Sequence, residues 1–236
     1  MTRSNALSKP KRLPLVIADR IQDEVFARGL SVGDHLPTEA KLAEQHDVSR
    51  TVVREAARIL EHRGLVDIRP GRGMTVAAPD LTPITRHYSL LLRSNPEAFD
   101  QLIDLRLLLE VQITGLAAEG RSEAHLERMA ASLARIRDHR DDFDIVLEED
   151  LRFHALVSEA SGNAVMAMFL DPVNECLRET YRVPFAYLSR LDHTLEEHEA
   201  ILKAISEQDV PASRLAATRH LQRIKSYTTG LIADTD

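Results

Sequence analysis

Beyond about residue 80, apolar positions recur at helical spacing in one segment after another, and no convincing strand pattern is present there. Glycine, proline and aspartate turn signals separate the segments. The predicted helices cover residues 82–93, 96–119, 123–140, 143–161, 164–182, 191–208 and 210–232. Together they predict an all-α antiparallel helical bundle in the C-terminal part of the chain.

The N-terminal part has a different pattern, which begins with a helix predicted over residues 15–28. Between residues 36 and 76 follow two short helices, a tight turn and a β-hairpin, with Ser49 placed as the N-cap of the second short helix. The apolar positions of that helix face the core and leave Arg50, Thr51 and Arg54 exposed near its start. The chain is therefore predicted to be mainly α: a winged helix-turn-helix of three helices and a β-hairpin wing, followed by the helical bundle.

The exposed residues at this helix start have the chemistry of a DNA-contacting surface. An arginine guanidinium matches guanine O6 and N7 and attracts phosphate, and serine or threonine hydroxyls can bond to backbone oxygens. Gly71 and Gly73 allow a tight turn at the tip of the wing, where Arg72 can touch phosphate or enter the minor groove. Two exposed arginines alone are usually just solvated, but the order helix, turn, helix and basic wing favours double-stranded DNA.

The segment resembles the DNA-binding domain of the GntR family of bacterial transcription regulators. The motifs that carry the resemblance are Leu36-Pro37-Thr38-Glu39, Val48-Ser49-Arg50-Thr51, Val53-Arg54-Glu55, Gly64-Leu65 and Gly71-Arg72-Gly73. Many relatives have an arginine directly after the glutamate of the first motif, where this chain has Ala40, so Lys41 is left to supply a point charge there. The residues predicted to contact DNA are Thr38, Lys41, Ser49, Arg50, Thr51, Arg54, Gly71, Arg72 and Gly73.

Charge is unevenly distributed along the chain of 236 residues, of which 44% are hydrophobic and whose formal net charge is −7. Residues 1–78 carry 13 Lys and Arg against 10 Asp and Glu, whereas residues 79–236 carry 17 against 27. Such asymmetry is expected when only one domain meets phosphate. The expected organisation is a flexible basic arm over 1–14, the DNA-binding domain over 15–78, a linker with a short helix over 79–95, and the bundle over 96–236.

The single cysteine, Cys176, excludes an internal disulfide and fits a reducing cytosol. No apolar run is long enough to span a bilayer, and the first residues lack the apolar core of a signal peptide. We therefore expect a cytoplasmic bacterial protein without a membrane partner, associated with the nucleoid when it is bound to DNA.

Four side chains in the predicted bundle suit a transition metal. Asp150 and His154 lie four residues apart on one helix and so share a face, while His198 and His220 lie in the last two helices. One carboxylate and three imidazoles that converge in a bundle core would suit Zn, Ni, Mn or a similar divalent ion. The spacing alone is a weak signal, because an aspartate and a histidine four residues apart often form an exposed hydrogen-bonded pair.

The bundle resembles the FCD domain, the ligand-binding domain of the FadR branch of the GntR family. In that domain an aspartate and three histidines commonly hold a divalent metal, and the matching residues are Asp150, His154, His198 and His220. Arg106 and Glu110 match the arginine and glutamate of the family's first bundle helix. The resemblance implies that Arg106 pairs with the carboxylate of an organic acid that also binds the metal. We expect the metal to be Zn rather than Ni or Mn.

Both residues assigned to the effector have structural alternatives. Arg106 can instead form an ion pair with Glu110 or Asp104, four or two residues away on the same helix. Asn163, which we also place at the effector site, can instead cap a helix.

The alternative function is a metal-dependent enzyme built in the bundle, with an accessory DNA-binding domain. The Glu-x-x-His spacing of di-iron oxidases is missing, although Glu148, Glu149, Glu196 or Glu197 could serve as a general base. The fused DNA-binding domain weighs against an enzyme, and the acidic bundle weighs against a purely architectural DNA-binding protein. We predict a homodimeric transcription factor, most often a repressor in such families, that reads a pseudo-palindromic operator and responds to a small carboxylate.

Overall fold

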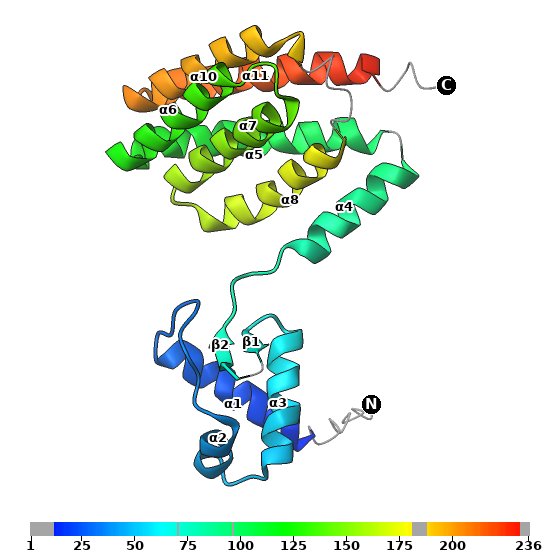
Figure 1. The fold of residues 1–236 in the computed structure, drawn as a ribbon, viewed down its shortest axis with the longest axis vertical. Helices are drawn as coiled ribbons and strands as arrows, with labels where there is room; N and C mark the ends of the chain where they lie inside the picture. Colours follow the sequence, from blue (N-terminus) through cyan, green and yellow to red (C-terminus); the bar gives the residue numbers. More distant parts are fainter. Residues whose placement is uncertain (1–11, 70, 96, 181–187, 232–236) are drawn as a thin grey trace, which may run out of the picture. The chain divides into compact units, whose positions relative to one another are not determined.

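The computed structural model describes residues 12–231 apart from residues 70, 96 and 181–187. The chain divides into two compact units, Met1–Asp80 and Leu81–Asp236. Figure 1 shows the helices and strands of each unit, and each unit has a hydrophobic core of its own. Residues 1–11 of the predicted basic arm lie outside the described residues, and the first helix begins at Leu13.

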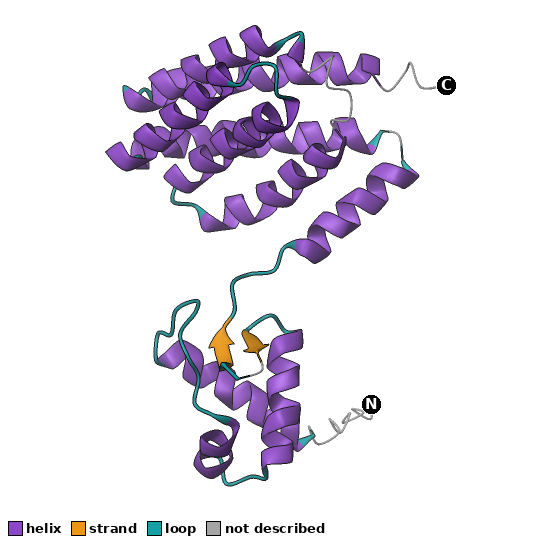
Figure 2. Ribbon diagram, in the orientation of Figure 1, coloured by secondary structure: helices purple, strands orange, loops and turns teal. Residues whose placement is uncertain are grey.

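The first unit is a winged helix-turn-helix, as predicted. Its elements, shown by type in Figure 2, are α1 (Leu13–Ala27), α2 (Glu39–Gln45), α3 (Arg50–His62), β1 (Val66–Arg69) and β2 (Gly73–Val76). Thr38 and Ser49 cap α2 and α3, since each side chain accepts a hydrogen bond from a backbone N–H of the first turn. Asp47 lies between the two helices with a φ of 50°, a conformation that aspartate tolerates better than most residues.

The wing is a two-stranded antiparallel hairpin in which Arg69 pairs with Gly73 at the tip. Gly71 and Gly73 have φ values of 77° and 79°, in the region that favours glycine. The segment before α2 runs along the second strand, where the N–H of Leu36 donates to the carbonyl of Met74 at 3.0 Å. The wing is therefore hydrogen-bonded to the body of its unit.

The second unit is a helical bundle. Its described helices are α4 (Thr82–Ser94), α5 (Ala98–Gly120), α6 (Glu123–Asp138), α7 (Phe143–Ala160), α8 (Ala164–Thr180), α10 (Leu191–Ser206) and α11 (Val210–Leu231). Each predicted helix is found, and residues 96, 181, 182 and 232 of the predicted ranges lie outside the described part. None of the helices in the described ranges has both the length and the apolar character that a membrane span requires.

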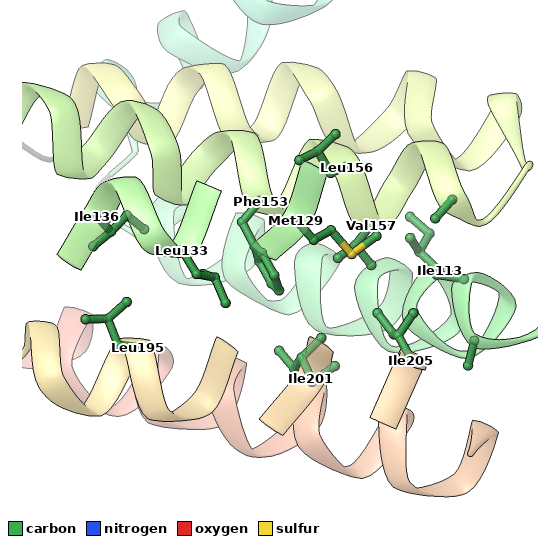
Figure 3. Close-up of a cluster of buried hydrophobic side chains, with 14 of the residues drawn as sticks. Ile113, Met129, Leu133, Ile136, Phe153, Leu156, Val157, Leu195, Ile201 and Ile205 are labelled. Atoms are coloured by element: carbon green, nitrogen blue, oxygen red, sulfur yellow. The ribbon is translucent and has the colours of Figure 1, made fainter. Parts of the chain in front are cut away.

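The core of the bundle is built from the inner faces of several helices. Figure 3 shows the labelled apolar side chains of α5, α6, α7 and α10 pointing into a shared interior. Phe153 of α7 and Ile205 of α10 are fully buried there. This apolar interior surrounds the polar residues described below and keeps water away from them.

Helix α4 was grouped with the linker in the sequence analysis, but its packing places it in the second unit. Tyr88 and Leu92 of α4 pack against a small apolar cluster that includes Phe99 of α5 and Val173 of α8. This apolar contact explains why the helix joins the bundle. The connection between the last strand of the wing and α4 is therefore only residues 77–81.

Candidate functional site

The residues predicted to contact bases gather at the start of α3. Arg50, Thr51 and Arg54 are exposed, whereas Val53 and Ala57 are buried on the face that packs in the core with α1. A recognition helix presents the side chains of its N-terminal turns to the major groove in this way. The amphipathic pattern of α3 thus determines which side chains are available to DNA.

The hydroxyls of Thr38 and Ser49 have a structural role in addition to the DNA contact predicted for them. Thr38 Oγ1 accepts from the N–H of Lys41, and Ser49 Oγ accepts from the N–H of Val52, both at 3.3 Å. Each cap uses an oxygen lone pair and leaves the hydroxyl hydrogen able to donate to a phosphate oxygen. Ala40 and Lys41 are both exposed in the first turn of α2, so Lys41 is the cation that this turn offers.

Arg54 is paired across the helix-turn-helix. Its Nη2 atom lies 3.3 Å from Oε2 of Glu39, and the two side chains are 59% and 36% exposed. An ion pair with this much exposure contributes little to stability, so its guanidinium can be released to a base or phosphate at small cost. Glu39 is a residue of the GntR motif for which the sequence analysis proposed no role.

The wing presents Arg72 between its two glycines. Arg72 is exposed, and its backbone N–H donates to the carbonyl of Arg69 at 3.0 Å, which closes the turn. Gly71 and Gly73 serve the backbone conformation of this turn rather than a side-chain contact. The wing thus offers Arg72 at a tightly turned tip, with the exposed Arg69 beside it at the end of β1.

A second site lies inside the bundle, where two helices carry stripes of buried polar residues. The stripes are Arg106, Glu110 and Thr114 on α5, and Asp150, His154 and Ser158 on α7. Spacing of four residues places the members of each stripe on one helix face. Oε2 of Glu110 lies 2.8 Å from Nδ1 of His154, so the two stripes meet at this contact.

Two further helices bring histidines to the same place. His154 of α7, His198 of α10 and His220 of α11 are buried, and one ring nitrogen of each lies within 4.8 Å of the others. The Nε2 atoms of His198 and His220 are 3.3 Å apart. Oδ1 of Asp150 lies 3.6 Å from Nε2 of His198, so the carboxylate adjoins this cluster of three imidazoles.

Burial favours the neutral form of two of these imidazoles, His198 and His220. Loss of hydration lowers the pKa of His198 well below 6.5, and the neighbouring imidazoles and Arg106 lower it further. Burial also lowers the pKa of His220, although its hydrogen bond to Glu197 opposes that shift. Neutral imidazole is the form that binds a metal ion, so the rings of His198 and His220 are in the form that a ligand requires.

Two glutamates that the sequence analysis did not link to the histidines lie behind them. Besides the contact of Glu110 with His154, Oε2 of Glu197 lies 2.7 Å from Nδ1 of His220. Burial alone would raise the pKa of Glu110, but the positive charge of Arg106 and the hydrogen bonds from Arg106 and His154 hold it well below its usual range. The arrangement depends on the register between helices. Only the general tendency of metal-binding histidines to donate their other ring N–H to a carboxylate could have suggested it from the sequence.

The donor set fits a divalent transition metal. Oδ1 of Asp150 and Nε2 of His154 are buried, and neither has a hydrogen-bond partner among the described residues. Buried polar atoms are rarely left without partners, and these two lie beside two further imidazoles. Three imidazole nitrogens and one carboxylate oxygen suit Zn, Ni or Mn.

The two residues assigned to the effector adopt the structural alternatives that the sequence left open. Nε of Arg106, which is 2% exposed, donates to Oε1 of Glu110 at 2.5 Å. Asn163 is a helix cap, since its Oδ1 accepts from the N–H of Met166 at 3.1 Å and α8 begins at the next residue. Arg106 still adds a positive charge beside the imidazoles.

Both units match known protein families. Residues 14–76 match the family described as bacterial regulatory proteins, gntR family, and residues 101–223 match the FCD domain. The chain is 32% identical to the HTH-type transcriptional regulator LutR of Bacillus subtilis (strain 168), over 85% of this chain and 94% of LutR. It is 27% identical to the HTH-type transcriptional repressor NanR of Cronobacter sakazakii, over 91% of this chain and 84% of NanR.

The fold is also similar to solved structures. The structure of a Streptococcus agalactiae GntR covers 90% of this chain and 99% of its own, with a TM-score of 0.72 and 28% sequence identity. The likeness therefore extends over both the winged helix-turn-helix and the bundle.

Because His198 and His220 are neutral when folded, we predict that metal-free protein loses stability as the pH falls from about 7.5 to about 5.5. In the unfolded chain these rings take up protons near pH 6.5, whereas the folded rings do not. Stability is therefore fully present above that pH and is lost below it, by about 1.4 kcal/mol per pH unit for each such ring. Melting temperatures measured across this range check the sign.

In the variant His198→Leu the melting temperature should depend less steeply on pH, because one of the two buried rings is gone. Glu110 and Glu197 do not contribute in this window, because their pKa values are lowered from 4.5. A melting temperature that stays level or rises on acidification would contradict the prediction.

Proposed function

The chain belongs to the GntR family of bacterial regulatory proteins, with an FCD ligand-binding domain in its second unit, and we propose that it represses transcription until a small organic acid binds at a divalent-metal centre. It is a DNA-binding transcriptional regulator, and its families and relatives are regulators rather than enzymes. The metal-dependent enzyme considered above is therefore set aside. The buried convergence of three imidazoles and a carboxylate in the bundle is the observation that carries the proposal.

The start of α3 and the wing are the surfaces that we assign to the operator. Arg50, Thr51 and Arg54 are exposed on the first turns of α3, where they can contact base edges in the major groove. Thr38, Lys41 and Ser49 can reach phosphates around that groove, and Arg72 can reach a phosphate or the minor groove from the wing. Base contacts would supply specificity, and the phosphate contacts would supply salt-dependent affinity.

Asp150, His154, His198 and His220 would hold the ion, with Zn preferred over Ni or Mn. When bound, the ion supplies coordination positions for the oxygens of a carboxylate. Asp150 cancels one of its two positive charges, while Arg106 and Glu110 offset each other, so one net positive charge remains for a monocarboxylate. Arg106 strengthens the attraction from beside the imidazoles, whereas Asn163, as a helix cap, is not part of the assigned effector site.

Repression relieved by the acid is the direction of control that we propose. The relative NanR is named a transcriptional repressor, which supports this choice. An effector can shift operator binding only if it binds more tightly to one of two protein states that differ in DNA affinity. The acid should therefore favour the state with the lower operator affinity.

Replacing Arg54 by Ala should cost about 1–3 kcal/mol of specific binding and relax the sequence preference, because a base-reading fork is lost. Arg72→Ala should instead weaken binding to all sequences and reduce the slope of log affinity against log salt by about 1. Binding to operators selected from random duplexes, measured at several salt concentrations, separates the two effects. Wild-type affinity and preference in Arg54→Ala would refute the assignment of α3.

His198→Ala should abolish metal binding and the response to organic acids, while the far-UV circular dichroism stays helical. The matched control is His193→Ala, because His193 is exposed on the same helix. Metal analysis and thermal-shift screening of small organic acids on Zn-loaded protein provide the measurements, and an acid that raises the melting temperature should release operator DNA. Wild-type protein that takes up neither Zn nor Ni would remove the metal centre from the proposal.

A homodimer is the assembly that we propose, because one winged domain reads only a few base pairs and two related by a two-fold axis read a pseudo-palindrome. Sedimentation velocity should show a dimer at micromolar concentration, and a duplex with two half-sites should bind two chains. Monomer alone, with and without operator DNA, would exclude this assembly.

A further inference from the structure

His154 and His220 are held by the same arrangement, although they come from different helices. In each case the Nδ1 atom faces a glutamate oxygen, and the glutamate is bound in turn by an arginine. The arrangement appears twice around a single cluster of imidazoles. This repetition indicates a purpose beyond the stability of one buried ion pair.

Around His154 every member of the arrangement is buried. Arg106, Glu110 and His154 are 2%, 5% and 4% exposed. A charged carboxylate can only accept hydrogen bonds. In the neutral form that a metal ligand must have, the contact of 2.8 Å between Glu110 and His154 therefore places the ring hydrogen on Nδ1. The lone pair of Nε2 is then left facing the site.

Around His220 the same geometry is built from α10 and α11. Oε2 of Glu197 lies 2.7 Å from Nδ1 of His220, and Arg223 donates to both carboxylate oxygens of Glu197 at 2.6 Å. Arg223 also donates to the hydroxyl of Thr194 at 3.0 Å. A bidentate pair of this kind fixes the plane of the carboxylate and thereby the direction from which it meets the ring.

His198 differs from the other two. Its Nδ1 atom is buried and has no hydrogen-bond partner among the described residues. The ring is instead stacked on Phe153, with centroids 4.5 Å apart and an angle of 17° between the planes. Apolar packing orients this ring. The three imidazoles therefore allow a comparison between rings held by a glutamate, His154 and His220, and a ring held by stacking, His198.

We propose that Glu110 and Glu197 are positioning residues for the metal centre: each holds the hydrogen of its histidine on Nδ1 and turns Nε2 toward the ion. Arg106 and Arg223 neutralise the two glutamates and fix their orientation. The inference rests on the proposed metal centre, and it adds two carboxylates that do not touch the ion. Outer carboxylates of this kind raise the basicity of a ligating imidazole and reduce the cost of ordering it.

A purely structural role would give the same contacts but a different response to mutation. A structural ion pair affects folding and leaves the affinity of the folded protein for metal unchanged. A positioning residue changes metal affinity and the tautomer of one named ring. These two readouts distinguish the roles.

Glu197→Gln is the first variant, since Glu197 is only partly buried and the amide preserves its shape. The amide has no negative charge, and its NH2 group must face either the Nε–H of Arg223 or Nδ1 of His220. We therefore expect Zn affinity to fall by about 10–100-fold in a competition with a chromophoric chelator. Glu196→Gln is the matched control, with the same loss of charge at an exposed neighbouring position. Glu197→Asp keeps the carboxylate and should retain more affinity than Glu197→Gln.

Nitrogen NMR of the imidazoles in metal-free protein gives the second readout. In the wild type, His154 and His220 should each show one tautomer with the hydrogen on Nδ1, and only His220 should lose that preference in Glu197→Gln. A His220 that carries its hydrogen on Nε2 in the wild type overturns the proposal. So does a Glu197→Gln variant with wild-type Zn affinity and an unchanged tautomer.

Glu110 needs a paired variant, because its removal alone would leave the buried charge of Arg106 without its carboxylate. Arg106→Met with Glu110→Gln removes both charges, and it should lower Zn affinity and disturb the tautomer of His154 alone. If the wild type binds no metal, the proposed function fails, whereas the NMR readout on metal-free protein still decides the positioning role. The two failures are therefore distinguishable.

Discussion

Burial of charge at the centre of the helical bundle is the constraint on which the rest of the second unit depends. Ionised groups lose their hydration when they are buried, and this cost is met only by close partners with good geometry. Arg106 with Glu110 and Arg223 with Glu197 provide such partners. The apolar core shown in Figure 3 includes Phe153, which lies against His154 and His198. Such packing excludes water and strengthens the electrostatic contacts inside.

This constraint also explains the neutral state of His198 and His220. A protonated histidine in this interior would add positive charge beside two arginines, so burial and the neighbouring cations favour the neutral ring. The hydrogen of His220 is then directed to Glu197, and the Nε2 atom on the opposite side of that ring lies 3.3 Å from Nε2 of His198. The same contacts that make burial tolerable thus prepare the site for a cation.

The helices and the four candidate ligands could be predicted from the sequence. The contacts between helices could not, because they depend on tertiary packing. Helical periodicity and turn signals located the helices, and motif resemblance located Asp150 and the three histidines. The pairing of Glu197 with His220 could not be predicted, because it depends on how α10 and α11 are set against each other. Local alternatives were visible in advance: Arg106 with Glu110 is a contact between residues four apart, and Asn163 directly precedes a helix.

Helix α4 shows why a short amphipathic segment is hard to assign. Its pattern is that of a helix, but none of its residues is fully buried, so neither its length nor its composition separates a linker helix from a bundle helix. Tyr88 and Leu92 place it in the bundle by partial burial against α5 and α8. Segments with few buried contacts are the least costly to displace. Since residues 77–81 join α4 directly to the wing, the covalent route from the bundle to the DNA-binding unit passes through the helix that the bundle holds least firmly.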